Sequence, residues 1–199
     1  MFAPLGRLLN GGLVTTGHRM TATEMLDDSL AVLRARWYLR NATSLGERVR
    51  LWGRPIVRNH GSLVIGQRAC LVSGGLPIQL TTERDGKLEI GARTFMNYGC
   101  SIIATKLVSI GPNCKLGMEV LMMDNDFHQI DPVERGARPA SAPIVLEENV
   151  WLGARVIVVS GVTIGADSVV AAGSVVTRDI APRSFAAGQP ARVIRSVDD

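Results

Sequence analysis

The chain of 199 residues is 46% hydrophobic and 5% aromatic, and its 22 basic and 18 acidic side chains give a net charge of +4. It is long enough to bury one core with a small appendage, and it contains no run of about 18 apolar residues that could span a membrane. Basic residues crowd two stretches, 34–54 and 178–195, which are either solvated faces or a pocket for a polyanionic ligand.

The first 45 residues are predicted to form an arm and a helix outside the main domain. Residues 1–20 are rich in glycine and lack periodicity. No long apolar block follows a basic one there, which argues against a secretory signal and favours a cytoplasmic protein. A helix is predicted from Thr23, because Thr21 or Thr23 can cap it and acidic residues fill its first turns.

One face of this predicted helix is apolar. The side chains that form the stripe are Leu26, Leu30, Leu33 and Trp37. We expect the stripe to dock on the main domain or on a neighbouring subunit, although a helix that lies on a membrane surface would share the pattern.

Residues 46–199 are predicted to form the main domain, which is organised around a six-residue period. One row of inward positions recurs every sixth residue, and a second row follows four residues after each member of the first. The first row is Leu146, Leu152, Val158, Ile164, Val170 and Val176, and the second is Val150, Val156, Val162, Ser168, Ser174 and Ile180. A helical period would not hold this phase. The pattern predicts a parallel β-helix in which three six-residue units close each triangular coil.

Upstream, the same period begins at Ile65 and is less regular. Residues 46–64 indicate irregular entry strands, residues 77–89 a hairpin-like turn, and residues 105–108 a corner insertion. The main interruption is a polar, proline-bearing loop at about 124–143, after which the chain returns to the coil. Long loops in a repeat scaffold often carry the function.

This loop opens with Asp-Asn-Asp-Phe-His at 124–128. His128 could act as a general base near neutral pH, with a carboxylate of Asp124, Asp126 or Asp131 orienting its ring. A single histidine in a polar loop is weak evidence by itself. The three histidines are too scattered for a metal site, and the three cysteines lack metal-type spacing, so we predict no metal and assign the cysteines to core packing.

Four stretches carry a family resemblance: MNYGCSI at 96–102, the DNDFH loop, ENVWLGARVIVVSGVTIG at 148–165, and AAGSVVTRDIAPRSFAAGQPARVIR at 171–195. They resemble the hexapeptide acyltransferases, in particular the galactoside, maltose and surface-polysaccharide O-acetyltransferase branch, over about residues 60–195. The resemblance implies a left-handed parallel β-helix, acetyl-CoA as donor, no metal, and a homotrimer whose active sites lie between neighbouring coils.

The resemblance also implies roles for individual residues. The predicted catalytic residues are His128, as general base, and Asp126. The predicted substrate-binding residues are Asn97, Asp124 and Trp151. The predicted cofactor-binding residues are Gly153, Ala154, Ala172, Thr177, Arg178, Arg192 and Arg195. Small residues would leave backbone amides free beside the CoA arm, and arginine can donate twice to a phosphate. Thr105 replaces an aspartate that helps to hold the sugar in galactoside enzymes, which argues against a galactoside acceptor.

We therefore predict an acetyl-CoA-dependent O-acetyltransferase that modifies a hydroxyl of a sugar or of a glycan or polysaccharide precursor. One alternative is an N-acetyltransferase of a nucleotide-linked amino sugar on the same fold. Another is a non-catalytic β-helix scaffold, which would bind no CoA. Neither a nucleic-acid partner nor a transmembrane segment is expected.

Overall fold

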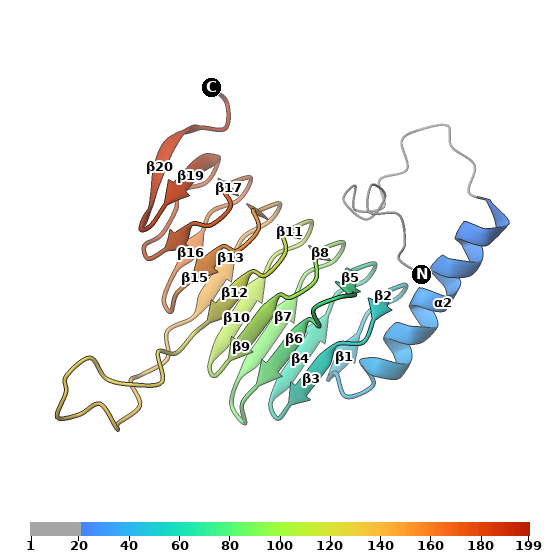
Figure 1. The fold of residues 1–199 in the computed structure, drawn as a ribbon, viewed down its shortest axis with the longest axis horizontal. Helices are drawn as coiled ribbons and strands as arrows, with labels where there is room; N and C mark the ends of the chain where they lie inside the picture. The colour runs from blue at the N-terminus through green and yellow to red at the C-terminus, as the bar shows by residue number, and fades with distance from the viewer. Residues whose placement is uncertain (1–20) are drawn as a thin grey trace.

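The computed structural model describes residues 21–199, so the predicted arm at 1–20 lies outside the described residues. One helix, α2 (Ala22–Tyr38), precedes a solenoid of short strands, which confirms the predicted short helical segment and the predicted β-helix. Figure 1 shows α2 against the first strands of the coil and the strands stacking from there toward the C-terminus.

Three parallel sheets form the faces of the coil, and the chain visits them in turn. Sheet A contains β1 (Ser44–Leu45), β4 (Ser62–Ile65), β7 (Lys87–Ile90), β10 (Leu107–Ile110), β13 (Ile144–Leu146) and β16 (Thr163–Ile164). Sheet B contains β2 (Arg50–Gly53), β5 (Cys70–Ser73), β8 (Phe95–Met96), β11 (Lys115–Leu116), β14 (Trp151–Leu152), β17 (Val169–Val170), β19 (Ser184–Gly188) and β20 (Ala191–Ser196). Sheet C contains β3 (Ile56–Asn59), β6 (Gln79–Thr82), β9 (Ser101–Ala104), β12 (Leu121–Met123), β15 (Ile157–Val158) and β18 (Val175–Val176).

Both predicted rows of inward side chains form the core. Every member of the row from Leu146 to Val176, and of the row from Val150 to Ile180, is buried. The two serines of the second row keep their hydrogen bonds inside the coil, because Ser168 Oγ donates to the carbonyl of Ala181 and Ser174 Oγ to that of Ala171. The six-residue period is therefore a packing period of stacked aliphatic side chains.

Two local predictions upstream were wrong. Residues 46–64 contain regular strands, because β2 and β3 already pair in parallel register with β5 and β6. Residues 77–89 form no hairpin, since β6 belongs to sheet C and β7 to sheet A. Between these two strands lies a tight corner turn, in which Gly86 N donates to the carbonyl of Glu83.

The corners between the sheets are named here by the faces they join, so that the A–B corner leads from sheet A into sheet B. Glycines at the A–B corner allow successive coils to approach closely. A methyl group added at Gly91 would lie 2.4 Å from the carbonyl carbon of Gly111 and from the nitrogen of Pro112. Contact at that distance is with backbone, which cannot move aside without shifting the next coil.

We expect Gly91→Ala to lower the free energy of unfolding by about 1–3 kcal/mol, because the added methyl group overpacks this corner. Thermal unfolding followed by circular dichroism measures the effect. Gly74→Ala is the matched control, since an added methyl group there meets no atom within 4 Å. Equal melting temperatures for the two variants would contradict the close approach of the coils.

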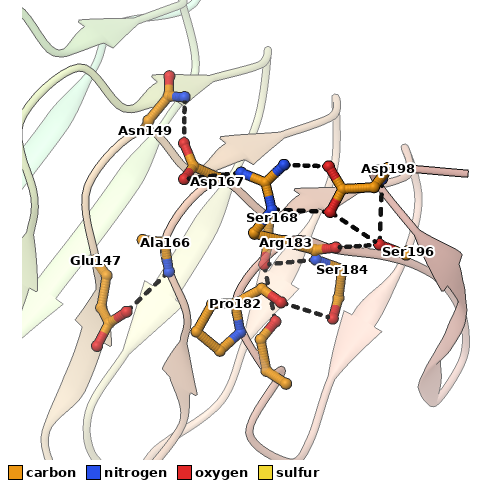
Figure 2. Close-up of polar contacts among 11 residues, drawn as sticks. Glu147, Asn149, Ala166, Asp167, Ser168, Pro182, Arg183, Ser184, Ser196 and Asp198 are labelled. Atoms are coloured by element: carbon orange, nitrogen blue, oxygen red, sulfur yellow. Dashed lines mark hydrogen bonds and ion pairs between the residues drawn. The ribbon is translucent and has the colours of Figure 1, made fainter.

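At the C-terminal end, a ladder of polar side chains along the A–B corner joins the last strands to the coil (Figure 2). Asn149 Nδ2 donates to Asp167 Oδ1 at 2.7 Å, and Arg183 Nη1 lies 3.7 Å from Asp167 Oδ2. Arg183 also pairs with Asp198, and this pairing holds the pKa of the Asp198 carboxyl below its usual value. The ladder therefore connects the hairpin of β19 and β20, which pair in antiparallel register, to the preceding coils.

Candidate active site

The predicted loop leaves the coil after β12 and returns at β13, so its bounds are 124–143 as predicted. Figure 1 shows it projecting far from the C–A corner. Asp124 fixes its first residue. The Asp124 carboxylate is fully buried and accepts hydrogen bonds from the amides of Thr105, Lys106 and Leu107, each at 2.7 Å, and from the Thr105 hydroxyl at 2.8 Å.

Both carboxylate oxygens of Asp124 are thus used by the corner that precedes β10. Its main-chain carbonyl accepts from the amide of Ala142 and from the hydroxyl of Ser160, which closes the base of the loop. These contacts favour a structural role for Asp124. Its predicted role in substrate binding stays a prediction. To bind a substrate, the Asp124 carboxylate would have to break or share its four hydrogen bonds to the corner.

A second cluster holds the neck of the loop, and it contains residues that sequence reasoning missed. Asn125 is buried, and its side-chain amide donates to the carbonyl of Pro139 and the hydroxyl of Ser141. Arg138 forms two hydrogen bonds with Glu83, at 2.7 and 2.9 Å, and its guanidinium lies 4.5 Å from the centre of the Phe127 ring. Asn125 and Phe127 precede His128 in the Asp-Asn-Asp-Phe-His stretch, but their partners lie more than ten residues later, so the sequence pattern did not reveal this cluster.

His128 is exposed on this loop, and its ring Nδ1 lies 3.0 Å from the carbonyl oxygen of Arg135. A carbonyl oxygen only accepts, so this hydrogen bond requires the proton on Nδ1 and leaves the Nε2 lone pair free when the ring is neutral. Asp126 contacts His128 through the backbone, where its carbonyl accepts from the His128 amide at 2.8 Å. Among residues 21–199, a backbone carbonyl and not a carboxylate therefore orients the ring.

Small predicted site residues follow one another along the B–C corner. Asn97 comes directly after β8, Gly153 and Ala154 after β14, and Ala172 after β17. The corners are stacked closely, because the amide of Gly173 donates to the carbonyl of Ala154 at 2.8 Å and a methyl group added at Gly153 would lie 2.5 Å from the Ala172 nitrogen. Trp151 lies on the outer side of sheet B beside this corner, with 53% of its surface exposed.

The residues predicted to bind the CoA phosphates, Thr177 and three arginines, lie at the C-terminal end of the coil on two different faces. Thr177 and Arg178 follow β18 and are exposed at the C–A corner. Arg192 and Arg195 lie on β20, the edge strand of sheet B, and the Arg195 guanidinium is 5.3 Å from the centre of the Phe185 ring. All four side chains are open to solvent.

One copy of the described chain does not bring all of these residues together. The B–C corner collects Asn97, Gly153, Ala154 and Ala172, whereas the loop with His128 leaves from the C–A corner. No contact joins His128 to Trp151 or to the B–C corner within residues 21–199. The face that carries the histidine and the face that carries the small residues are therefore separate on one copy.

The cysteines pack inside the protein, as predicted. Burial raises the pKa of the Cys70 and Cys114 thiols to about 11 and that of Cys100 to about 12. The neutral thiols of Cys100 and Cys114 donate to backbone carbonyls of the next coil. Within residues 21–199 no three histidine, cysteine, aspartate or glutamate side chains group as metal ligands, and no helix is both long and apolar enough to cross a membrane.

Comparison with known proteins matches residues 143–178 to the family described as hexapeptide repeat of succinyl-transferase. Galactoside O-acetyltransferases of Escherichia coli and Lactococcus lactis are 37% and 36% identical to the chain over 112 and 114 residues, and each match covers 56% of this chain. Residues 143–178 therefore carry a hexapeptide repeat, and the chain is similar to acetyltransferases that contain this repeat. It spans about half the length of these curated relatives, 55% and 54% respectively.

A solved structure resembles the fold of this chain beyond the matched repeat. A solved structure of a hexapeptide-repeat acetyltransferase from Vibrio cholerae, in complex with acetyl coenzyme A, superposes with a TM-score of 0.58 at 25% identity. The match covers 100% of both chains.

Proposed function

We propose that this protein is an acetyl-CoA-dependent O-acetyltransferase that modifies a hydroxyl of a sugar or of a glycan precursor, in the cytoplasm. The observation that carries the proposal is the His128 ring on the projecting loop, whose Nδ1 is held by the carbonyl of Arg135 so that Nε2 is free to accept a proton. The similarity to galactoside O-acetyltransferases and the acetyl coenzyme A bound to the Vibrio cholerae acetyltransferase support the choice of donor.

In the proposed reaction, His128 Nε2 takes the proton of the acceptor hydroxyl as the hydroxyl oxygen attacks the thioester carbonyl carbon. The carbonyl oxygen becomes an oxyanion, for which the backbone N–H group of Ala154 is the proposed donor, since those of Gly153 and Arg155 already donate within the coil. When the tetrahedral intermediate collapses, the carbon–sulfur bond breaks, the thiolate of CoA leaves, and the imidazolium returns its proton to the sulfur. The products are an acetyl ester and free CoA, with no covalent enzyme intermediate.

We propose a homotrimer in which neighbouring copies share each site. The separate positions of the His128 loop and the B–C corner on one copy support this, because a site that needs both requires the loop of one copy and the corner of another. Trp151 then provides an exposed flat ring for a sugar face, and the amides of Ala154 and Ala172, next to Gly153 and Gly173, face the CoA arm.

The donor half of the proposal is tested by calorimetric titration with acetyl-CoA. We expect the variant with Arg178, Arg192 and Arg195 all changed to alanine to bind at least about tenfold more weakly, because each charged hydrogen bond to phosphate contributes about 1.5 kcal/mol or more. A variant of equal charge change, Arg58→Ala with Arg68→Ala and Arg84→Ala, removes three exposed arginines elsewhere and should bind as the unaltered protein does.

A thiol-release assay over hydroxyl and amine sugars then tests the acceptor half. Release of CoA with hydroxyl acceptors supports O-acetylation, and release only with amino sugars would replace it by N-acetylation. Absence of acetyl-CoA binding in the unaltered protein would overturn the proposed function and leave a β-helix scaffold.

A further inference from the structure

Helix α2 docks on the coil by a face that the apolar pattern did not indicate. Ala31 and Ala35 of the helix and Leu39 directly after it are fully buried, and Ala35 and Leu39 belong to the same core cluster as the first coil. On the same side, the Asp27 carboxylate accepts from Trp52 Nε1 at 3.1 Å and Asp28 pairs with Arg50 at 3.1 Å. The small alanines allow a close approach, and the two acidic side chains find their partners on β2.

The predicted stripe therefore points away from the coil. Successive residues turn by about 100° around a helix, which places the stripe opposite the docked face. The exposed fractions of Leu26, Leu30, Leu33 and Trp37 are 61%, 40%, 59% and 66%. These four residues are called the outer stripe below. Among residues 21–199 nothing covers it, so the expectation that the stripe docks on the main domain was wrong.

Arginines flank the outer stripe. By the same helical geometry Arg36 lies on one side of it and Arg34, which pairs with Asp27, on the other, while Arg40 follows the end of the helix at Tyr38. The Arg40 guanidinium lies 5.4 Å from the centre of the Trp37 ring, and that of Arg54 lies 5.4 Å from the centre of the Tyr38 ring. The long arginine side chains can lie along apolar surface while their charges reach outward.

The charge of this end of the molecule is one-sided. Residues 22–59 contain seven arginines and four acidic residues. Asp28 pairs with Arg50, and an Asp27 oxygen lies 3.9 Å from an Arg34 nitrogen, which leaves five arginines against two glutamates. A second copy that docked its own stripe here would bring two arginine-rich faces together, and like charges oppose that contact. The face is complementary to an anionic surface.

We propose that α2 binds peripherally to a membrane surface that contains anionic lipids. The outer stripe would enter the boundary between headgroups and acyl chains, with Trp37 at the depth that tryptophan favours, and the flanking arginines would meet lipid phosphates. The coil would then stand on the bilayer by its N-terminal end. This inference does not depend on the acetyltransferase activity proposed above.

The test is co-sedimentation of the full chain with vesicles, either phosphatidylcholine alone or equal parts of phosphatidylcholine and phosphatidylglycerol. We expect binding to the anionic vesicles that weakens as salt is raised. The stripe variant Leu33→Gln with Trp37→Gln should lower the partition coefficient at least about tenfold, because two apolar side chains no longer enter the lipid. Arg36→Gln with Arg40→Gln should weaken binding to the anionic vesicles specifically.

The matched control is Val193→Gln with Ile194→Gln, an equally exposed apolar pair on β20 at the other end of the coil, which should bind vesicles as the unaltered protein does. Absence of vesicle binding by the unaltered protein overturns the proposal. So does a stripe variant that binds normally. If the stripe variant instead changes its oligomeric state in sedimentation velocity, a second copy occupies the outer stripe. If only its melting temperature falls, residues 1–20 or another part of the chain covers the stripe.

Discussion

Replacing His128 by alanine is expected to lower kcat by about 10²–10⁴-fold, which is the usual contribution of a positioned general base. The acetyl-CoA dissociation constant and the melting temperature should stay as they are, because the ring is exposed and contacts the protein through one hydrogen bond to the Arg135 carbonyl. Initial rates of thiol release measure the first quantity, and calorimetry and thermal unfolding measure the other two.

His60→Ala is the matched control for this experiment. His60 is also exposed and also lies at the C–A corner, directly after β3, but it belongs to the coil and not to the projecting loop. It should leave kcat unchanged. Normal turnover in His128→Ala would remove the general base from the mechanism, whereas a loss of acetyl-CoA binding in the same variant would place the histidine against the donor.

Asp124→Ala is expected to destabilise the protein by about 3–5 kcal/mol and to lower its melting temperature by about 10 °C. Three amides and the hydroxyl of Thr105 lose their acceptor together, and each donor left without a partner costs about 1–3 kcal/mol when water cannot replace it. Partial entry of water at this corner keeps the expected total below the full sum. Thermal unfolding gives the measurement.

Asp126→Ala serves as the control, because this carboxylate lies two residues later in the same loop and is exposed. Its effect on stability should stay within about 0.5 kcal/mol. The same pair of variants separates a structural from a substrate-binding role for Asp124. If Asp124→Ala melts normally and raises the KM for the acceptor, its four hydrogen bonds to the corner do not stabilise the fold and the predicted substrate contact regains support.

The coil could be predicted because every coil buries a residue at the same position of the six-residue period. Val150 and Val156 are buried for the same reason, contact with the coils before and after, so the period appears in the chain without knowledge of distant partners. The loop bounds followed from the same period, which stops at Met123 and resumes at Ile144. A repeat makes long-range packing visible as a local pattern.

The wrong predictions concern segments whose structure depends on contacts with residues far along the chain, which the six-residue period does not reveal. Asp85 and Gly86 form a dipeptide that favours hairpins, but parallel pairing of β6 with β9 and of β7 with β10 sets the path of the chain. For α2, hydrophobicity indicated the wrong face, since the docking of Asp28 depends on Arg50 of β2. Asn125 was overlooked because its partners Pro139 and Ser141 follow fourteen and sixteen residues later.

The hydrogen bond between the Asp124 carbonyl and the Ala142 amide has a consequence for how this scaffold can change. It brings the two ends of the loop at 124–143 together. After the loop, β13 pairs with β10 in parallel, as β10 pairs with β7. For a loop whose ends already meet, doubling its length costs only about 0.6 kcal/mol of closure entropy. Insertions and deletions between these two residues can therefore accumulate without disturbing the solenoid, and new loop sequences can be tried on a fixed frame.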